Sequence, residues 1–269
     1  MTSSPPAAAA PAFDSSLLTV AHDGPVAHIR LSRPAKRNAI SDQLIGYLQA
    51  AFATLPTVIR AVVLSGEGDH FCAGLDLSEV SERDVGEGIV HSRMWHAAFE
   101  QIQFGRVPVI AVLHGAVVGG GLELASATHI RVAETNAFYA LPEGQRGLFV
   151  GGGGSASIPR LIGVPRMTDM MMTGRVLDAT EGQQLGISQY LVEPGAGLAK
   201  AFELARKVAS NAPLSNFAVM HALPRISDMS QSDGLFVESL MAAIAQGDDA
   251  AKERVRAFLD GRAAKVSKG

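Results

Sequence analysis

The chain has 269 residues, 47% of them apolar, which is long for one domain and short for two and predicts one main domain plus an appendage. A formal net charge of −3 provides no basic surface, so neither nucleic acid nor an anionic membrane is an expected partner. The single cysteine, Cys72, excludes an internal disulfide and a cysteine-rich metal site, and no apolar run is long enough to span a bilayer.

Residues 1–16 consist largely of Ser, Pro and Ala, and the chain has no Lys or Arg before Arg30. A secretory signal needs a basic start and a transit peptide is rich in Arg, so neither is indicated. We expect a disordered tail over residues 1–16 and a cytoplasmic location.

Residues 17–21 and 26–31 are apolar or alternating runs joined through an Asp-Gly turn, which predicts a β-hairpin. A polar, cationic loop follows over residues 32–40. Ser41 is placed to cap the next helix, and residues 60–64 return as a buried strand. Strand, helix and strand in this order predict a crossover unit.

Asp76 and Glu79 follow this strand with the spacing of a helix N-cap and its reciprocal partner, so helix capping is the ordinary interpretation of Asp76. A long helix is then expected over residues 87–103. It carries Met94 and Trp95 on its apolar side.

The most informative stretch is 108–127. Residues 109–113 form an apolar, β-branched run typical of a buried strand, and three glycines at 119–121 precede the helix-compatible sequence Leu-Glu-Leu-Ala. Glycines let a ligand approach the main chain, and a helix N-terminus offers unpaired N–H groups. We therefore expect a site for negative charge here, beside the carboxylate of Glu123.

The rest of the chain is mostly helical. Four glycines at 151–154 again indicate a helix N-terminus close to a ligand or another backbone segment. Further strands are expected at 129–133, 137–140 and 189–192, and further helices at 166–172, 178–185, 198–209, 213–223 and 234–259.

Glycine runs invite comparison with nucleotide-binding motifs. The chain has no Gly-x-x-x-x-Gly-Lys-Ser/Thr and no Gly-x-Ser-x-Gly, and its late glycine run does not open a first βαβ unit. The histidines show no helical metal-binding pair. No metal and no cofactor are therefore expected.

Glu123 has two possible roles. A glutamate in a first helical turn is often only a favourable partner of the helix dipole. Its neighbours are apolar, however, and Glu143 follows twenty residues later, also beside glycine, after a strand expected in the same sheet. Two carboxylates that converge on one apolar pocket would perturb each other's pKa, as acid and base catalysis requires. The sequence leaves open whether they converge.

The segments 71–77, 109–123 and 139–154 resemble the three signature segments of the crotonase (enoyl-CoA hydratase) superfamily, together with residues 33–39 and 172–175. Residues 141–154 and the C-terminal half are similar to its methylthioacryloyl-CoA hydratase branch. The resemblance implies an α/β fold, a crotonase-like spiral of ββα repeats at 17–195, with a C-terminal α-helical trimerisation region at 196–269. A homotrimer or homohexamer is the implied assembly.

The resemblance also implies the catalytic residues. The backbone N–H groups of Leu75 and Gly120 match the oxyanion hole, in which two preorganised donors stabilise charge on a thioester oxygen. Glu123 and Glu143 match the two glutamates of hydratases, which hold one water between them. Relatives that catalyse isomerisation, decarboxylation or dehalogenation often lack one of the two, so their joint presence favours hydration.

For coenzyme A, the resemblance points to residues on two loops and to a third contact from a neighbouring subunit. The third contact usually comes from the lysine of a Phe-x-x-Lys motif. In this chain the motif begins at Phe258, and Gly261 stands at the lysine position. Arg262, the next residue, is a candidate replacement. The acyl pocket would draw on Met94, Trp95, Phe149 and Val150, with Arg146 nearby. The implied coenzyme A contacts are Arg37, Ala39, His70, Ala73, Gly74, Asp76 and Leu77.

The function implied is reversible hydration of a 2-enoyl-CoA thioester, possible substrates including 3-methylthioacryloyl-CoA. An enoyl-CoA isomerase or an acyl-CoA thioester hydrolase of the same superfamily is the alternative within enzymes. A catalytically silent acyl-CoA-binding protein is the alternative from another class, and the presence of both glutamates argues against it.

Overall fold

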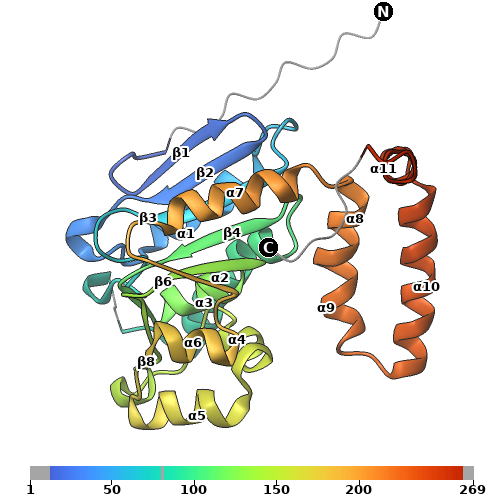
Figure 1. The fold of residues 1–269 in the computed structure, drawn as a ribbon. Coiled ribbons are helices and arrows are strands. Elements are labelled where there is room, and N and C mark those ends of the chain that lie inside the picture. The colour runs from blue at the N-terminus through green and yellow to red at the C-terminus, as the bar shows by residue number, and fades with distance from the viewer. Residues whose placement is uncertain (1–12, 80–81, 263–269) are drawn as a thin grey trace, which may run out of the picture.

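A computed structural model describes residues 13–79 and 82–262 of the chain (Figure 1). Its main sheet has the strand order β1-β2-β3-β4-β6-β9, antiparallel between β1 and β2 and parallel elsewhere. A smaller sheet has the order β5-β7-β8. The strands are β1 Leu18–Asp23, β2 Val26–Leu31, β3 Ala61–Gly66, β4 Val109–Leu113, β5 Ala116–Val118, β6 Ile130–Glu134, β7 Phe138–Ala140, β8 Leu177–Asp178 and β9 Tyr190–Val192.

Helices follow the strands in a repeating order. The remaining elements are α1 Asp42–Ala53, α2 Val85–Gln103, α3 Gly120–Ser126, α4 Gly154–Ile162, α5 Val164–Thr173, α6 Ala179–Leu185, α7 Gly197–Ala209, α8 Pro213–Phe217, α9 Leu223–Ile226, α10 Gln231–Gly247 and α11 Asp249–Leu259, with short 3-10 turns η1 Pro34–Lys36, η2 Leu77–Glu79 and η3 Gly144–Arg146.

Successive ββα units stack on one another. The units β4-β5-α3 and β6-β7-α4 pair in parallel through both of their strands, β4 with β6 and β5 with β7. Two earlier units are shorter versions, because Cys72 bridges Val117 and Ile40 bridges Leu75 where a second strand would lie. The expected spiral of ββα repeats is therefore present.

The N-terminal elements form as predicted. β1 and β2 pair as a hairpin, and the side chain of Ser41 accepts a hydrogen bond from the Leu44 N–H at the start of α1. Residues 1–12 of the expected tail lie outside the described residues. Phe13 is described and packs edge-to-face on Tyr47, with ring centroids 5.6 Å apart.

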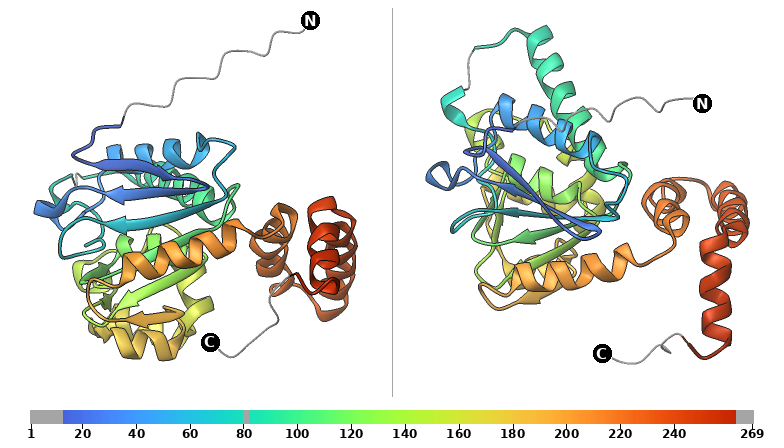
Figure 2. Two further views of the ribbon diagram at one scale, coloured as in Figure 1. Left: turned by 45° about the horizontal axis from the view of Figure 1, so that its top comes forward. Right: turned by 90° about the horizontal axis from the view of Figure 1, so that it is seen from above.

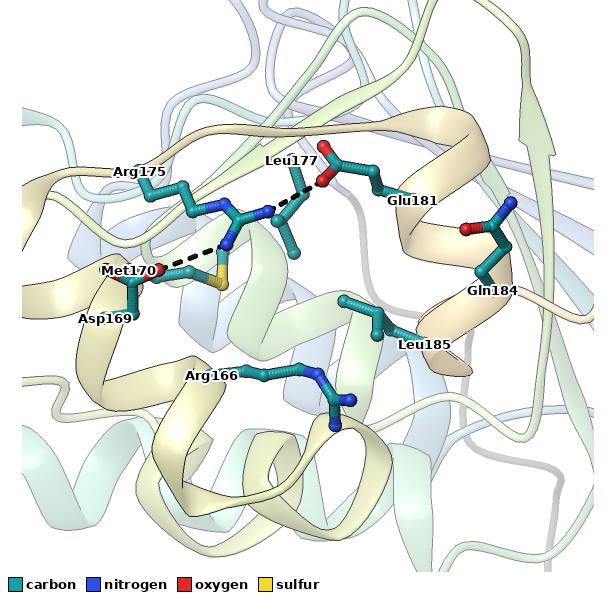
Figure 3. A pocket seen from close by; sticks show the side chains of 8 residues that line it. All are labelled: Arg166, Asp169, Met170, Arg175, Leu177, Glu181, Gln184 and Leu185. Atoms are coloured by element: carbon teal, nitrogen blue, oxygen red, sulfur yellow. Dashed lines mark hydrogen bonds and ion pairs between the residues drawn. The ribbon is translucent and has the colours of Figure 1, made fainter.

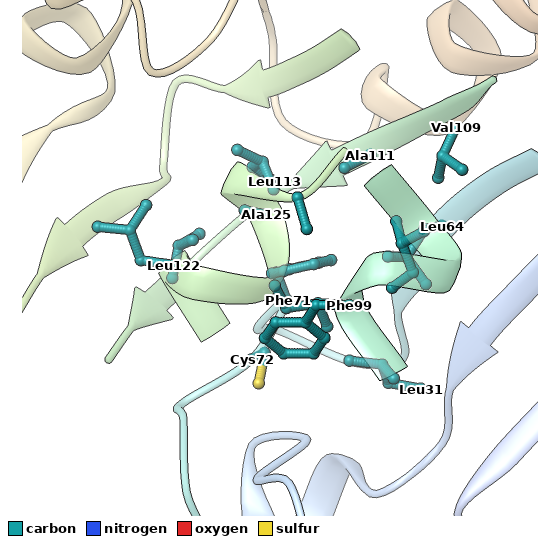
Figure 4. Packing of buried hydrophobic residues seen from close by; sticks show 14 of the residues in the cluster. Leu31, Leu64, Phe71, Cys72, Phe99, Val109, Ala111, Leu113, Leu122 and Ala125 are labelled. Carbon is teal, nitrogen blue, oxygen red and sulfur yellow. The ribbon is translucent and has the colours of Figure 1, made fainter. Parts of the chain in front are cut away.

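The main sheet is covered on both faces, which explains why its strands are apolar throughout. On one face α7 lies across β3 and β4 and buries Ala201, Leu204 and Ala205 against them (Figure 1). On the other face α1, α2 and α3 enclose the larger core. Figure 4 shows its centre, where Phe71, Cys72 and Phe99 lie beside Leu122 and Ala125 of α3.

Helices α8 to α11 lie beside the body of the molecule (Figures 1 and 2). His221 bonds to the Gly105 carbonyl, Arg225 lies 4.6 Å from the centre of the Phe104 ring, and Arg160 pairs with Asp228 at 3.0 Å. Large apolar side chains remain exposed on these helices, including Phe236 and Phe258. The assignment of residues 196–269 to a trimerisation region stays a prediction.

Two expected helices are interrupted. The single helix predicted at 234–259 is wrong, because Asp248 is extended and its carboxylate accepts the Ala251 N–H, which ends α10 and starts α11. Residues 213–223 contain α8, then a π-helical turn at Ala218–Ala222, then the start of α9.

A small cavity of about 120 Å³ lies between α5 and α6. Figure 3 shows that Arg175 fills its rim by reaching Asp169 on one side and Glu181 on the other, at 3.3 and 2.8 Å. These exposed ion pairs link the two helices, and they give the guanidinium of Arg175 a carboxylate partner on each side.

Two negative findings apply to residues 13–79 and 82–262. None of the helices there has both the length and the apolar composition needed to cross a bilayer. The same residues contain no group of three or more His, Cys, Asp or Glu side chains arranged to hold a metal ion.

The close packing of α3 against the Cys72 segment can be tested with two Gly→Ala substitutions. A methyl group on Gly121 would lie 2.3 Å from the Cys72 carbonyl oxygen, whereas one on Gly46 in α1 would meet no atom within 4 Å. We expect Gly121→Ala to lower the free energy of unfolding by roughly 2 kcal/mol or more, and Gly46→Ala to raise it by about 0.5–1 kcal/mol. Urea unfolding of both variants measures the difference, and equal effects would contradict the described packing.

Candidate active site

A cavity of about 540 Å³ opens where α2, the start of α3 and two loops meet. One loop contains residues 73–77 and the other residues 142–152. Its charged or polar side chains are those of Arg83, His91, Ser92, Glu123, Glu143 and Arg146; its apolar walls include Leu75, Leu77, Trp95, Val118, Leu148, Phe149 and Val150.

The backbone N–H groups of Leu75 and Gly120 lie at this cavity and have no hydrogen-bond partner among the described residues. The parallel bridge between the two loops uses the neighbours of Leu75, since Ile40 N–H donates to Gly74 and Asp76 N–H donates to Ile40, at 2.7 and 2.9 Å. Gly120 is the first residue of α3, where an N–H has no intrahelical acceptor.

Glycines bring these two amides together. Gly74 has φ +90°, and a methyl group on it would lie 3.1 Å from the Gly120 nitrogen. Gly119 has φ +53°, and a methyl group there would lie 2.6 Å from Oε1 of Glu143. A side chain at Gly74 would crowd the Gly120 amide, and one at Gly119 would crowd the carboxylate of Glu143.

Glu123 projects from the first turn of α3 and is only 4% exposed. The N–H groups of Gly152 and Gly154 both donate to its Oε1, each at 2.8 Å. The late glycine run therefore approaches another part of the same protein: the carboxylate of Glu123 occupies the N-terminus of α4. Burial raises the pKa of Glu123 against these two hydrogen bonds, and the charge of Glu143 raises it further.

Glu143 lies on the opposite loop, just before η3, and reaches the same cavity. Its Oε2 is buried without a hydrogen-bond partner among the described residues. Burial raises the pKa of Glu143, and the positive charge of Arg146 opposes this effect. The structure thus brings the two carboxylates to one cavity, where the sequence left their meeting open.

The two loops assigned to coenzyme A lie side by side. The carbonyl of Arg37 accepts the Ala73 N–H at 2.9 Å, and the bridge between Ile40 and Leu75 continues this pairing. Ala73, Gly74 and Leu77 line the cavity. Arg37 is exposed on the adjoining loop, with no ion pair among the described residues.

Four of the residues expected to contact coenzyme A do not line the cavity: Arg37, Ala39, His70 and Asp76. Asp76 accepts hydrogen bonds from the Ser78 hydroxyl at 2.6 Å and from Arg33 at 2.8 Å, which lower its pKa to about 2 despite burial. It precedes η2, but its expected reciprocal partner, the side chain of Glu79, lies outside what the structure describes.

His70 and Asn38 hold the same loops in place. Nδ1 of His70 accepts the Ala116 N–H at 3.0 Å, and burial followed by the charge of Arg37 lowers the pKa of the imidazole. Asn38, which the sequence reasoning missed, is fully buried at φ +55°. Its amide donates to the carbonyls of Glu67 and His70. An asparagine in a cationic loop was the only local signal for this role.

Three of the four residues expected in the acyl pocket line the cavity, Trp95, Phe149 and Val150. Met94 does not; it is partly buried and packs against the hydrophobic core instead. The sequence reasoning also missed Ser92 and His91. The Ser92 hydroxyl donates to the Gly151 carbonyl at 2.6 Å, and Nε2 of His91 lies 2.7 Å from Asp42.

Several known proteins resemble this chain in sequence and fold. The family described as enoyl-CoA hydratase/isomerase matches residues 22–268. A solved structure of a protein provisionally assigned as an enoyl-CoA hydratase, from Rhodopseudomonas palustris CGA009, is 60% identical with a TM-score of 0.91, covering 96% of this chain and 100% of that one. The 2,3-dehydroadipyl-CoA hydratase of Escherichia coli K12 is 31% identical over 91% of this chain and 96% of its own.

A further solved structure, from Thermobifida fusca YX in complex with CoA, is 26% identical with a TM-score of 0.79, covering 86% of this chain and 93% of its own. The fold and the matched sequence together define a crotonase-fold protein. The chain belongs to the enoyl-CoA hydratase/isomerase family.

The raised pKa of Glu143 predicts a pH-dependent cost to stability. A carboxylate whose pKa is raised by folding stabilises the fold only while protonated, so its contribution is lost as pH rises from the ordinary value of 4.5 through the raised one. Glu143→Gln removes the charge and keeps the shape. We expect it to raise the melting temperature at about pH 7.5, with the gain vanishing towards pH 4.5.

Thermal unfolding of both proteins across this pH range measures the difference. Glu238→Gln, an exposed glutamate on α10, is the matched control and should show no such trend. A gain that is equal at both ends of the range would contradict the burial of an ionised Glu143.

Proposed function

We propose that this protein hydrates 2-enoyl-CoA thioesters reversibly, adding water across C2 and C3. The observation that carries the proposal is the arrangement of Leu75, Gly120, Glu123 and Glu143, two free amides and two carboxylates around one cavity. The family match and the hydratase named among its relatives support the same reaction class.

The amides would act on the thioester carbonyl. When the oxygen of water bonds to C3, electrons move to the carbonyl oxygen and form an enolate-like oxyanion. Donors that are already aimed at this oxygen stabilise it without reorganisation, by about 3 kcal/mol for each donor. Because main-chain groups supply both bonds, the backbone path set by Gly74 and Gly119 matters more here than any side chain.

The carboxylates would handle the protons. Glu123 is fixed through Oε1 by α4, so its Oε2 stays available to orient the attacking water. Glu143 takes the proton that this water loses and delivers a proton to C2, which restores both carboxylates. Burial raises the pKa of both groups, which makes each a stronger base than an exposed glutamate.

Coenzyme A would lie along the paired loops 37–40 and 73–77. Arg33 and Lys36 both pair with Asp76, at 2.8 and 3.9 Å, so Arg37 is the cation of this loop left for a phosphate. Binding of CoA by the Thermobifida fusca relative supports this assignment. Arg262 pairs with Asp260 at 2.9 Å within the chain, and replacement of the missing lysine by Arg262 stays a proposal. The chemistry proposed requires no cofactor other than the coenzyme A of the substrate.

The acyl group is the least constrained part of the proposal. The resemblance to the methylthioacryloyl-CoA hydratase branch makes 3-methylthioacryloyl-CoA one candidate substrate. An isomerase that shifts the double bond or a hydrolase that releases free CoA could use the same amides, and product analysis separates the three.

We also propose assembly as a homotrimer or a homohexamer. Phe236, Leu240 and Ile244 follow one another at helical spacing on α10, and each is about half exposed or more. An apolar stripe of this kind is typical of a protein-protein interface. The residues assigned to trimerisation by the sequence include this helix.

The catalytic proposal predicts the behaviour of two variants. Glu123→Ala and Glu143→Ala should each lower kcat for hydration of crotonyl-CoA by about 10²–10⁴-fold, the usual worth of a positioned acid or base. Chromatography of the products should show 3-hydroxyacyl-CoA from the wild type, and circular dichroism should show that both variants fold. Full activity in either variant would remove the proposed mechanism.

The assembly proposal predicts that charge on the α10 stripe separates the subunits. The double variant Phe236→Lys, Leu240→Lys should sediment as a monomer under conditions in which the wild type sediments as a trimer or hexamer. Glu238→Ala, an exposed change on the same helix, should sediment like the wild type. A monomeric wild type would refute the assembly.

A further inference from the structure

Trp95 lies at the boundary between the cavity and the hydrophobic core. Its indole lines the cavity and is only 4% exposed. Phe99, one helical turn further along α2, packs edge-to-face on it with ring centroids 5.7 Å apart. Phe99 does not line the cavity, and Figure 4 shows it in the interior beside Cys72. The indole thus stands between the cavity and Phe99, beside the backbone of Gly152.

The edge of the indole also touches both backbone segments that hold the proposed reacting groups. A methyl group on Gly120 would lie 2.8 Å from Cζ3, and one on Gly152 would lie 3.1 Å from Cε3. Gly120 carries one of the two free amides, and the N–H of Gly152 holds Glu123. An acyl chain that continues past the carboxylate of Glu123 therefore meets this ring.

The ring is held on several sides and cannot swing away without disturbing the core. Phe99 supports it from behind, and the imidazole of His91 lies 6.2 Å from it on the side of the α2 N-terminus. His91 is itself fixed by Asp42 of α1 at 2.7 Å. The indole Nε1 has no hydrogen-bond partner among the described residues, so the residue serves here through its shape.

We propose that Trp95 sets the acyl chain length, so that the substrates are short-chain 2-enoyl-CoAs with about four acyl carbons. This inference rests on the proposed hydration of 2-enoyl-CoAs. Replacing the indole by a methyl group would open the cavity towards Phe99 and make space for about two or three more methylene groups. Each methylene that becomes buried strengthens binding by about fourfold.

The test compares but-2-enoyl-CoA with hex-2-enoyl-CoA, whose acyl chain is two methylenes longer. For the wild type we expect kcat/KM to be at least about tenfold higher for the four-carbon substrate. In Trp95→Ala the ratio of the six-carbon to the four-carbon value should rise by about 15-fold, from two newly buried methylenes. Trp95→Phe, which keeps most of the wall and loses no hydrogen bond, should give a small rise.

Phe99→Leu is the matched control, since it makes space behind an intact wall and should leave the order of substrates unchanged. If loss of the indole displaces Gly120 and stops turnover, competition binding of butyryl-CoA and hexanoyl-CoA gives the same ratio without catalysis. A wild type that accepts both lengths equally, or a ratio unchanged in Trp95→Ala by kinetics and by binding, would overturn the inference. If the wild type hydrates no enoyl-CoA, the proposed function is refuted instead. The ratio of the binding affinities for the two acyl-CoAs would then still decide the role of Trp95.

Discussion

Two main-chain N–H groups that the fold leaves unpaired set the geometry of everything around them. The N–H of Leu75 is free because the parallel bridge to Ile40 uses the carbonyl of Gly74 and the N–H of Asp76 instead. The N–H of Gly120 is free because a helix begins there. Unpaired polar groups inside a protein cost free energy, so they persist where a ligand supplies the acceptor. The ββα spiral brings the two amides together from segments 45 residues apart, which no single turn could do.

The two glutamates differ in how they are held, and this difference gives them different uses. Glu123 is anchored through one oxygen by the N-terminus of α4, whose positive end also favours its charge. Glu143 has a buried oxygen without a partner, and its ionised form is favoured by a hydrogen bond from its own backbone and by the charge of Arg146. A fixed carboxylate suits the orientation of water, and a less constrained one suits proton transfer. Both cost stability when ionised, because burial raises the pKa of each.

Much of the fold could be predicted because local patterns decide it. The Asp-Gly hairpin, the Ser41 cap and the apolar strand at 109–113 depend on neighbouring residues alone. The break at Asp248 could not, since aspartate suits a helix surface as well as an N-cap. For the site, the sequence indicated the residue types but not their contacts. The late glycine run binds Glu123, and Met94 packs against the hydrophobic core although Trp95 beside it lines the cavity. These outcomes depend on contacts between distant segments.

The most direct test of the account is a crystal structure with acetoacetyl-CoA, a thioester that cannot be hydrated. The account predicts that the thioester oxygen lies about 2.7–3.1 Å from both the Leu75 and the Gly120 nitrogen. It also predicts that C3 faces the carboxylates of Glu123 and Glu143. A thioester carbonyl bound away from the two amides, or with the glutamates turned out of the cavity, would contradict it.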